Sequence, residues 1–155
     1  MKWLVLYTRP NLELKIAKEI NELGIESYCP SYKQMKQYSD RKKQVVKPLL
    51  PSYVLVYINE KDRNLVFNVP GVLRYLFWLG KPAEVRTEEV DLLKQNISGV
   101  YSRVYIESLK KGENYTISSG PLKGHEGKVL NMSNNKLRLK LPNLGVLVTL
   151  QTVAA

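Results

Sequence analysis

The sequence has few of the side chains that enzyme and metal sites need. It contains one cysteine, Cys29, and one histidine, His125. A single cysteine forms no disulfide within the chain, which fits a reducing compartment, and we expect Cys29 to be a buried apolar residue. His125 has no other metal ligand at a suitable spacing, and no paired carboxylates or phosphate-binding glycine loop occur. The sequence therefore predicts a protein that is not an enzyme and that uses no metal or cofactor.

Long hydrophobic runs are also missing. No stretch reaches the roughly 18 apolar residues of a membrane-spanning helix, and the start, MKWLVLYTRP, lacks the pattern of a secretory signal. We therefore expect a cytoplasmic protein with no membrane partner. Hydrophobic residues make up 44% of the chain and charged residues 25%, which is typical of a globular protein. Its 155 residues are enough for one ordinary domain or two small ones.

Positive charge is concentrated in two stretches of a chain whose net charge is +10. Residues 31–48 carry six basic side chains against one acidic, and residues 109–155 carry seven against two, so each has a net charge of +5. The rest of the chain is balanced. Such stretches attract phosphate-rich partners. Solvated loop side chains would give the same pattern, and that alternative stays open here.

The stretch from Lys47 to Ile58, KPLLPSYVLVYI, is the part around which we expect the fold to be organised. Its second half is rich in β-branched and aromatic residues, which predicts a strand. Alternation places Tyr53, Leu55 and Tyr57 on one face and Val54, Val56 and Ile58 on the other. Because both faces are apolar, both must be covered. We expect helices of the same domain on the aliphatic face and a partner on the Tyr/Leu face.

The periodicity of residues 1–98 predicts an antiparallel sheet with helices against it. Asn11 is expected to cap the first helix, Gly24 to end it and Thr87 to cap the last helix. A polar, basic loop should follow the second strand, which Pro30 interrupts. In chain order, the predicted elements are strand 2–8, helix 12–23, edge strand 25–34, strand 52–58, helix 63–69, strand 72–79 and a helix from Thr87 whose apolar stripe is Val90, Leu93 and Ile97.

The last third of the chain has a different character. The pattern loosens over residues 99–108, where we expect a linker. LRLKL at 137–141 alternates between apolar and basic residues, and GVLVTL at 145–150 is typical of a strand. These features predict a small all-β unit at 109–155 with tight turns at Gly120, Gly124 and Gly127.

Four segments, in this order, resemble the NusG family of transcription elongation factors: WLVLYTRPNLE, DRKKQVVKPLLPSYVLVYI, PGVLRYLFWLGKPA and LKKGENYTISSGPLKGHEGKVLNM. The form DRKK…PLLPSYV is most similar to the specialised paralogues, the UpxY-type antiterminators of capsular polysaccharide operons and their relative RfaH. The resemblance implies an α+β fold. A NusG-type domain with a four-stranded antiparallel sheet and flanking helices would span residues 1–98, and a small KOW β-barrel would span residues 109–155.

The resemblance also implies what the protein does. The first domain would bind the clamp helices of the largest subunit of RNA polymerase, suppress pausing and promote processive antitermination, as a monomer. It would touch the exposed non-template DNA strand or the nascent RNA. The KOW domain would contact a ribosomal protein or a termination factor. The alternative is a ribosome-associated or general RNA-binding KOW protein that does not bind polymerase.

Candidate site residues follow from matching these positions to the family. Trp3 could equally be a core residue, and the His-Thr-Thr run that RfaH has near Arg63 and Asn64 is absent here. The polymerase-binding candidates are Trp3, Tyr7, Leu50, Tyr53, Leu55 and Phe77. The nucleic-acid-binding candidates are Arg9, Tyr38, Arg41, Lys42, Lys43, Arg63 and Asn64.

Overall fold

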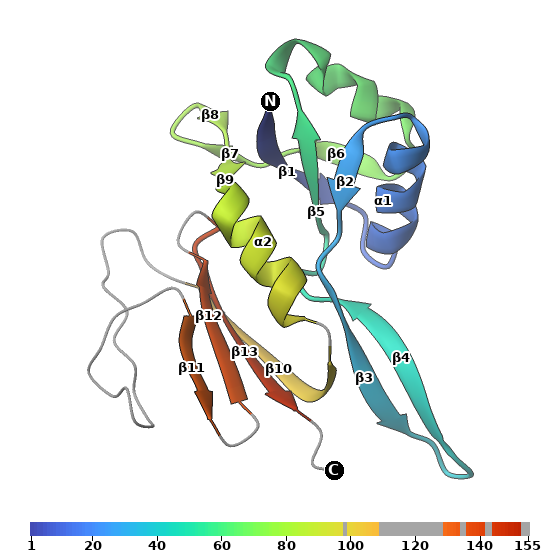
Figure 1. Ribbon diagram of the computed structural model, residues 1–155. Helices are drawn as coiled ribbons and strands as arrows, with labels where there is room; N and C mark the ends of the chain where they lie inside the picture. Colours follow the sequence, from blue (N-terminus) through green and yellow to red (C-terminus); the bar gives the residue numbers. More distant parts are fainter. Residues whose placement is uncertain (98, 109–128, 134–135, 142–143, 153–155) are drawn as a thin grey trace. The chain divides into compact units, whose positions relative to one another are not determined.

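The computed structural model of the chain describes residues 1–97, 99–108, 129–133, 136–141 and 144–152 (Figure 1). The chain divides into two compact units. The first unit comprises residues 1–31 and 48–97, and the second comprises residues 32–47 and 98–155. No helix in the described part of the chain is long and apolar enough to cross a membrane.

The first unit is built on an antiparallel sheet, as predicted. Its strands follow the spatial order β2-β5-β1-β6, and the short β9 also pairs with β1. The strand predicted at 52–58 is β5, and it lies between β2 and β1 in the sheet. The bounds are β1 Lys2–Thr8, β2 Glu26–Tyr28, β5 Tyr53–Ile58, β6 Val72–Tyr75 and β9 Glu84–Val85.

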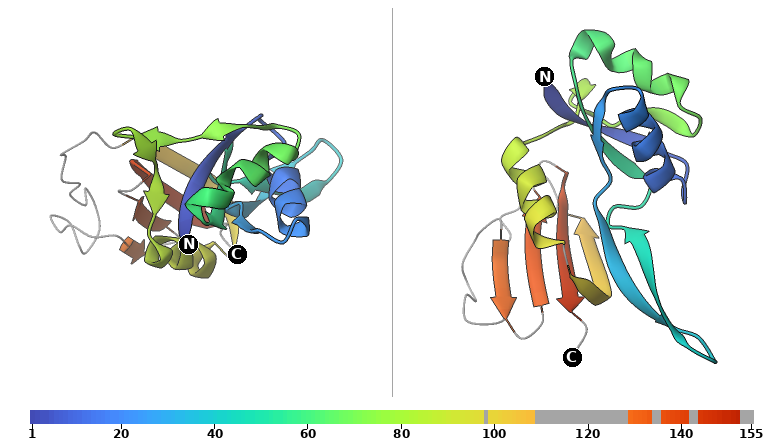
Figure 2. Two further views of the ribbon diagram at one scale, coloured as in Figure 1. Left: turned by 90° about the horizontal axis from the view of Figure 1, so that it is seen from above. Right: turned by 45° about the vertical axis from the view of Figure 1, so that its right-hand side comes forward.

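Helices of the same unit cover the aliphatic face of this sheet, which confirms that prediction. Figure 2 shows α1 (Glu13–Glu22) lying against one side of the sheet. The 3₁₀ helix η1 (Glu60–Asn68) contributes Val66 to the same core. Cys29 is also buried in this core, as expected, and burial raises the pKa of its thiol to about 12, with Glu13 as a second cause. The core cluster includes Leu4, Leu6, Ile16, Ala17, Ile20, Val54, Val56, Ile58 and Tyr75.

The two ends of α1 differ from each other in how well the sequence predicted them. Asn11 does not cap the helix: it has a left-handed φ of 68°, and Leu12 holds the N-cap position without a side-chain hydrogen bond. Asparagine tolerates this conformation, so Asn11 turns the chain instead. Gly24 ends the helix as predicted, with a φ of 87°. The Gly24 and Ile25 amides donate to the Asn21 and Ile20 carbonyls, which is the Schellman pattern.

The strand predicted at 72–79 is divided into two. After β6 the chain enters a separate hairpin, in which β7 (Phe77–Trp78) pairs with β8 (Lys81–Pro82). Leu79 and Gly80 connect them with φ values of 51° and 77°. Two successive positive φ angles are typical of a type I′ turn, which reverses the chain within two residues. The prediction of one continuous strand was therefore wrong.

The last helix of the first unit is α2 (Thr87–Asn96). Thr87 is its first helical residue and not its cap, because Arg86 has the extended conformation of the N-cap position. The predicted apolar stripe is present at Val90 and Leu93, which are fully buried, and Ile97 is half-buried at the C-cap.

The second unit contains a mixed sheet of order β11-β12-β13-β10-β3-β4. Two predictions were wrong here. The basic stretch predicted as a loop is the hairpin β3–β4, and residues 100–108, predicted as part of a linker, form β10. This strand pairs antiparallel with β13 and parallel with β3, so its partners come from distant parts of the chain. The bounds are β3 Ser31–Gln37, β4 Lys42–Pro48, β10 Val100–Ser108, β11 Val129–Ser133, β12 Lys136–Leu141 and β13 Val146–Thr152.

The alternation of LRLKL is confirmed in β12. Leu137, Leu139 and Leu141 are buried, whereas Arg138 and Lys140 between them are half-buried. Gly120, Gly124, Gly127 and His125 lie outside the described residues. The KOW barrel therefore stays a prediction.

Gly71 should be the glycine of the first unit that least tolerates a side chain. Its φ is 98°, and a Cβ there would lie 2.9 Å from Ile16 Cδ1 and 3.1 Å from Leu12 Cδ1. Gly71→Ala is expected to add the left-handed backbone cost of about 1 to 2 kcal/mol and a crowding cost of about 1 to 3 kcal/mol against α1. Urea unfolding followed by circular dichroism measures the loss.

Gly24→Ala is the matched control, because Gly24 has a similar φ of 87° with open space around its Cα. It should lose only the backbone contribution. Equal losses for the two variants would contradict close packing of α1 on the Gly71 turn.

Candidate functional site: an aromatic sheet face and a basic hairpin

The second face of the first unit's sheet is aromatic. Register places Trp3 opposite Tyr57, Val5 opposite Leu55, and Tyr7 opposite Tyr53. Opposite residues in antiparallel strands present their side chains on the same face. The Trp3 and Tyr57 ring centroids are 5.2 Å apart, and those of Tyr7 and Tyr53 are 5.8 Å apart. We call these six residues the aromatic face.

The Trp3 end of the aromatic face is covered by α2. The Lys94 ammonium lies 5.3 Å from the ring centroid of Trp3 and 5.3 Å from that of Tyr28, and it is 3.8 Å from a carboxylate oxygen of Glu26. Trp3 and Leu55 are buried, with 5% and 0% of their surfaces exposed. The expectation that only a partner covers this face was therefore wrong at this end, because a helix of the same unit lies over it.

The Tyr7 end of the aromatic face is more open. Tyr7 and Tyr53 are half-buried, and the exposed Arg74 on β6 places its guanidinium 5.4 Å from the centroid of the Tyr7 ring. Arg74 is opposite Tyr7 in the register of β1 and β6. The sequence reasoning missed this arginine. Its alternation with Tyr75 was the available signal, but that signal becomes informative only once β6 is known to pair with β1.

The six residues predicted to bind polymerase thus lie in different environments. Trp3, Leu50 and Leu55 are buried, and Tyr7 and Tyr53 are half-buried. Phe77 is 55% exposed, but it lies on the β7–β8 hairpin and not on the main sheet. The surface that the aromatic face offers is therefore centred on Tyr7 and Tyr53, with Arg74 beside them.

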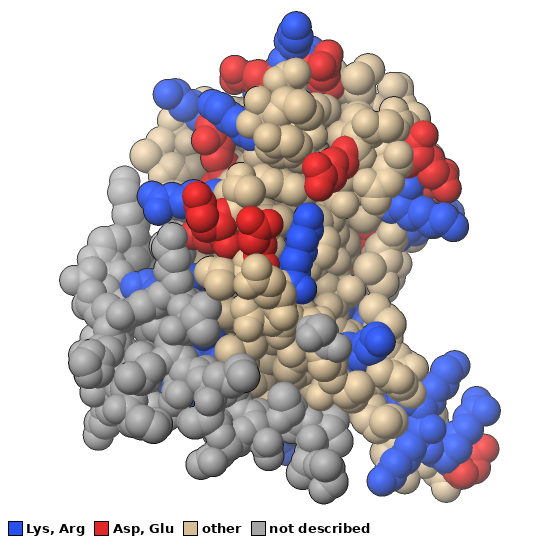
Figure 3. Space-filling model, in the orientation of Figure 1, with Lys and Arg blue, Asp and Glu red and all other residues tan. Residues whose placement is uncertain are grey.

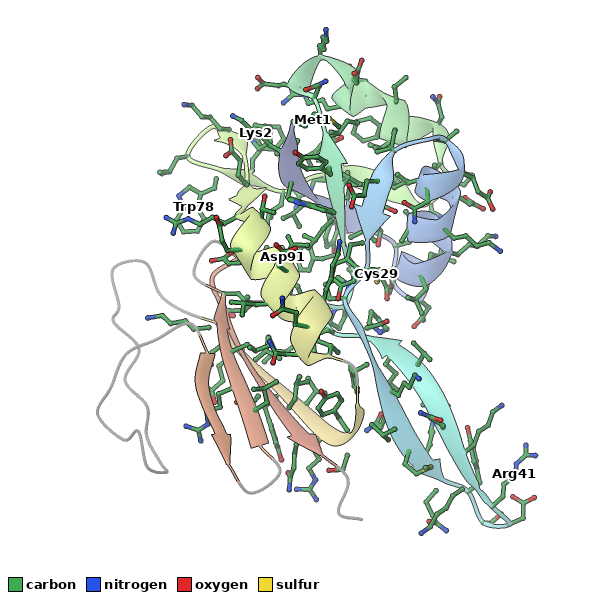
Figure 4. The ribbon with its side chains drawn as sticks, in the orientation of Figure 1. Met1, Lys2, Cys29, Arg41, Trp78 and Asp91 are labelled. Atoms are coloured by element: carbon green, nitrogen blue, oxygen red, sulfur yellow. The ribbon has the colours of Figure 1, made fainter. Side chains whose placement is uncertain are left out.

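The β3–β4 hairpin carries the predicted basic patch. The Tyr38 amide donates to the Arg41 carbonyl at 2.7 Å, which closes the tip, and Lys36 Nζ lies 5.8 Å from the centroid of the Tyr38 ring. Tyr38, Arg41, Lys42 and Lys43 are all exposed. Figure 3 shows basic side chains gathered at the end of this hairpin, and Figure 4 labels Arg41 there. A cationic tip with an exposed ring can contact phosphates and stack on a base.

The other predicted nucleic-acid contacts belong to different elements. Arg9 is exposed after β1, and its amide donates to the Gly71 carbonyl. Arg63 and Asn64 are part of η1, where the Arg63 carbonyl accepts the Tyr75 hydroxyl at 2.7 Å. Among the described residues, no group of three or more His, Cys, Asp or Glu side chains could hold a metal ion.

The comparisons with known proteins agree on one family. Residues 1–94 match the family model NusG, described as transcription termination factor nusG. The chain is 27% identical over 153 residues to the transcription termination/antitermination protein NusG of Staphylococcus aureus (strain Mu50), covering 89% of this chain and 83% of the relative. It is 24% identical over 151 residues to the protein of that name from Rickettsia bellii, covering 90% and 79%. A solved structure on domain interaction in Thermotoga maritima NusG is 21% identical with a TM-score of 0.44, covering 98% of this chain and 93% of that one.

Alkaline pH should destabilise the sheet through Tyr28, which lies at the Lys94 end of the aromatic face. Burial raises the pKa of Tyr28 to about 12, and the neighbouring Cys29 raises it further. Because the folded state holds this proton more tightly than the unfolded chain, the stabilisation is complete below pH 10. It is lost as the pH rises from about 10, the ordinary tyrosine pKa, towards 12.

Tyr28→Phe keeps the ring and removes this titration. The urea midpoint of the variant should match that of the parent near neutral pH and should fall less than that of the parent above pH 10. Parallel falls in the two proteins would contradict a protonated, buried Tyr28.

Proposed function

The chain belongs to the NusG family of transcription termination and antitermination factors, and on this premise we propose that it binds RNA polymerase and promotes processive elongation. The observation that supports this most directly is the half-exposed Tyr7–Tyr53 end of the aromatic face. An apolar groove or face that receives helices is a common recognition mode, and tyrosine is a frequent anchor at interfaces. The clamp helices of the largest polymerase subunit would bind here.

Tyr53→Ala should weaken binding to purified RNA polymerase by at least tenfold, because a central aromatic anchor is worth about 2 kcal/mol or more. The fold should survive, since Tyr53 is only half-buried and lies on the far side of the sheet from the α1 core. Binding is measured by titration, and folding is measured by thermal unfolding.

Tyr105→Ala is the control, because Tyr105 is an exposed aromatic residue of the second unit, on β10. It should bind polymerase as the parent does. A folded Tyr53→Ala protein with unchanged affinity would remove the aromatic face from the proposal. Recovery of ribosomal subunits in place of polymerase would favour the ribosome-associated alternative.

We further propose that the β3–β4 hairpin contacts nucleic acid in the elongation complex, either the non-template DNA strand or the nascent RNA. Its exposed basic side chains and the Lys36–Tyr38 pair support this. Phosphate contacts release counterions, so binding through them weakens steeply with salt.

Replacing Arg41 and Lys42 by glutamate should flatten the salt dependence of binding to single-stranded DNA. The slope of log K against log salt should fall by about 0.7 for each phosphate contact that is lost. The matched control reverses Lys15 and Lys18, two exposed lysines of α1. If both double variants change the slope equally, general charge and not the hairpin is responsible.

A finer proposal is that the chain is a specialised paralogue that acts on a capsular polysaccharide-type operon. Its support is the DRKK…PLLPSYV form of the sequence. A pausing assay with purified polymerase should show stronger suppression on the leader of such an operon than on an unrelated template.

A further inference from the structure

The β7–β8 hairpin ends in the most exposed apolar tip of the described residues. Phe77, Trp78 and Leu79 are 55%, 45% and 76% exposed. Leu79 also has a left-handed φ of 51°, in a turn position where Asn or Gly is usual. A leucine here is unfavourable for both the backbone and the solvation of the side chain. Strain of this kind is often retained where the residue has a function.

Register places Trp78 on the side of the aromatic face. Arg74 is opposite Tyr7, so alternation puts Leu76 and Trp78 on that side. Val85 is opposite Trp3, so alternation from β9 puts Ala83 and Lys81 there as well. Trp78 and Lys81 are opposite each other in the hairpin, so the two routes agree. By the same alternation, Phe77 points to the other side.

The hairpin is fixed to the sheet at its base. The Leu76 amide donates to the Val5 carbonyl at 2.8 Å, and the Ala83 amide donates to the Leu76 carbonyl at 2.7 Å. The flanking strands β6 and β9 both pair with β1. Trp78, labelled in Figure 4, and Leu79 are therefore held in place beside the aromatic face.

Two cations on this side have no carboxylate to neutralise them. The ion pairs of the described residues are Lys2 with Glu84 and Lys94 with Glu26. Arg74 and Lys81 have no such partner within the described ranges. The Tyr7 end of the aromatic face and the hairpin therefore combine apolar surface with unpaired positive charge.

We propose that Trp78 and Leu79 extend the docking surface, so that one helix of the protein partner lies between them and Tyr53, with acidic residues flanking its apolar stripe to meet Arg74 and Lys81. This rests on the proposed function, which makes that partner RNA polymerase. A second copy of the chain would bring like charges together, since the chain carries +10. A nucleic-acid strand would use the Trp78 ring and leave Leu79 in water.

Leu79→Asn separates binding from folding. Asparagine tolerates the left-handed conformation, so the variant should melt at the same or a higher temperature than the parent. Its affinity for purified RNA polymerase should nevertheless fall at least tenfold. Leu14→Asn, on an exposed leucine of α1, is the control and should bind as the parent does.

Charge is tested with Lys81→Glu against Lys61→Glu, both exposed lysines of the first unit. Only Lys81→Glu should weaken polymerase binding, and the loss should shrink at high salt. Equal effects of the two reversals would overturn the acidic character assigned to the helix.

Photo-crosslinking from positions 53 and 78 of the full chain in the polymerase complex identifies the occupant. Crosslinks from both positions to one polymerase helix support the proposal. Crosslinks to polymerase from position 53 alone, with Leu79→Asn binding normally, overturn it and leave the proposed function intact. Crosslinks from position 78 to nucleic acid or to a second copy also overturn it. The absence of polymerase crosslinks at both positions, with normal binding by Tyr53→Ala, overturns both proposals.

Discussion

The antiparallel pairing of β1 with β5 is the interaction on which the first unit depends. Each strand is apolar on both faces, so the pair cannot leave either face in water without cost. The aliphatic face is closed by α1 and η1 around a buried cluster. The aromatic face is closed by α2 at its Trp3 end and is more open at Tyr7 and Tyr53. The difference between the two ends of one face makes it a candidate interface.

The treatment of positive charge follows the same division. At the covered end, Lys94 lies over two aromatic rings and near Glu26. At the open end, Arg74 lies over Tyr7 without a carboxylate partner among the described residues. The β7–β8 hairpin continues this open end, because both of its flanking strands pair with β1. Cation, ring and exposed leucine thus occur together only where the sheet is least covered.

Errors in the sequence reasoning share a physical cause. Asn11 and Thr87 were placed correctly near helix starts, but the cap position depends on backbone angles that composition does not determine. The basic hairpin and β10 were assigned to a loop and a linker because their apolar residues show no single buried face. Both are strands because they pair with each other's unit members, and β10 pairs with β3 across more than 60 residues of chain.

Local pattern by itself determined the central strand, its two apolar faces, the α1 stripe with its Gly24 end, and the alternation of β12. These features depend on side-chain period and on a glycine's access to positive φ, which neighbouring residues are enough to specify. Only the tertiary structure decided which end of the aromatic face α2 covers, that Arg74 lies over Tyr7, and that Trp78 shares their side. These depend on strand register, which pairs residues distant in the chain and so cannot be found in any short segment.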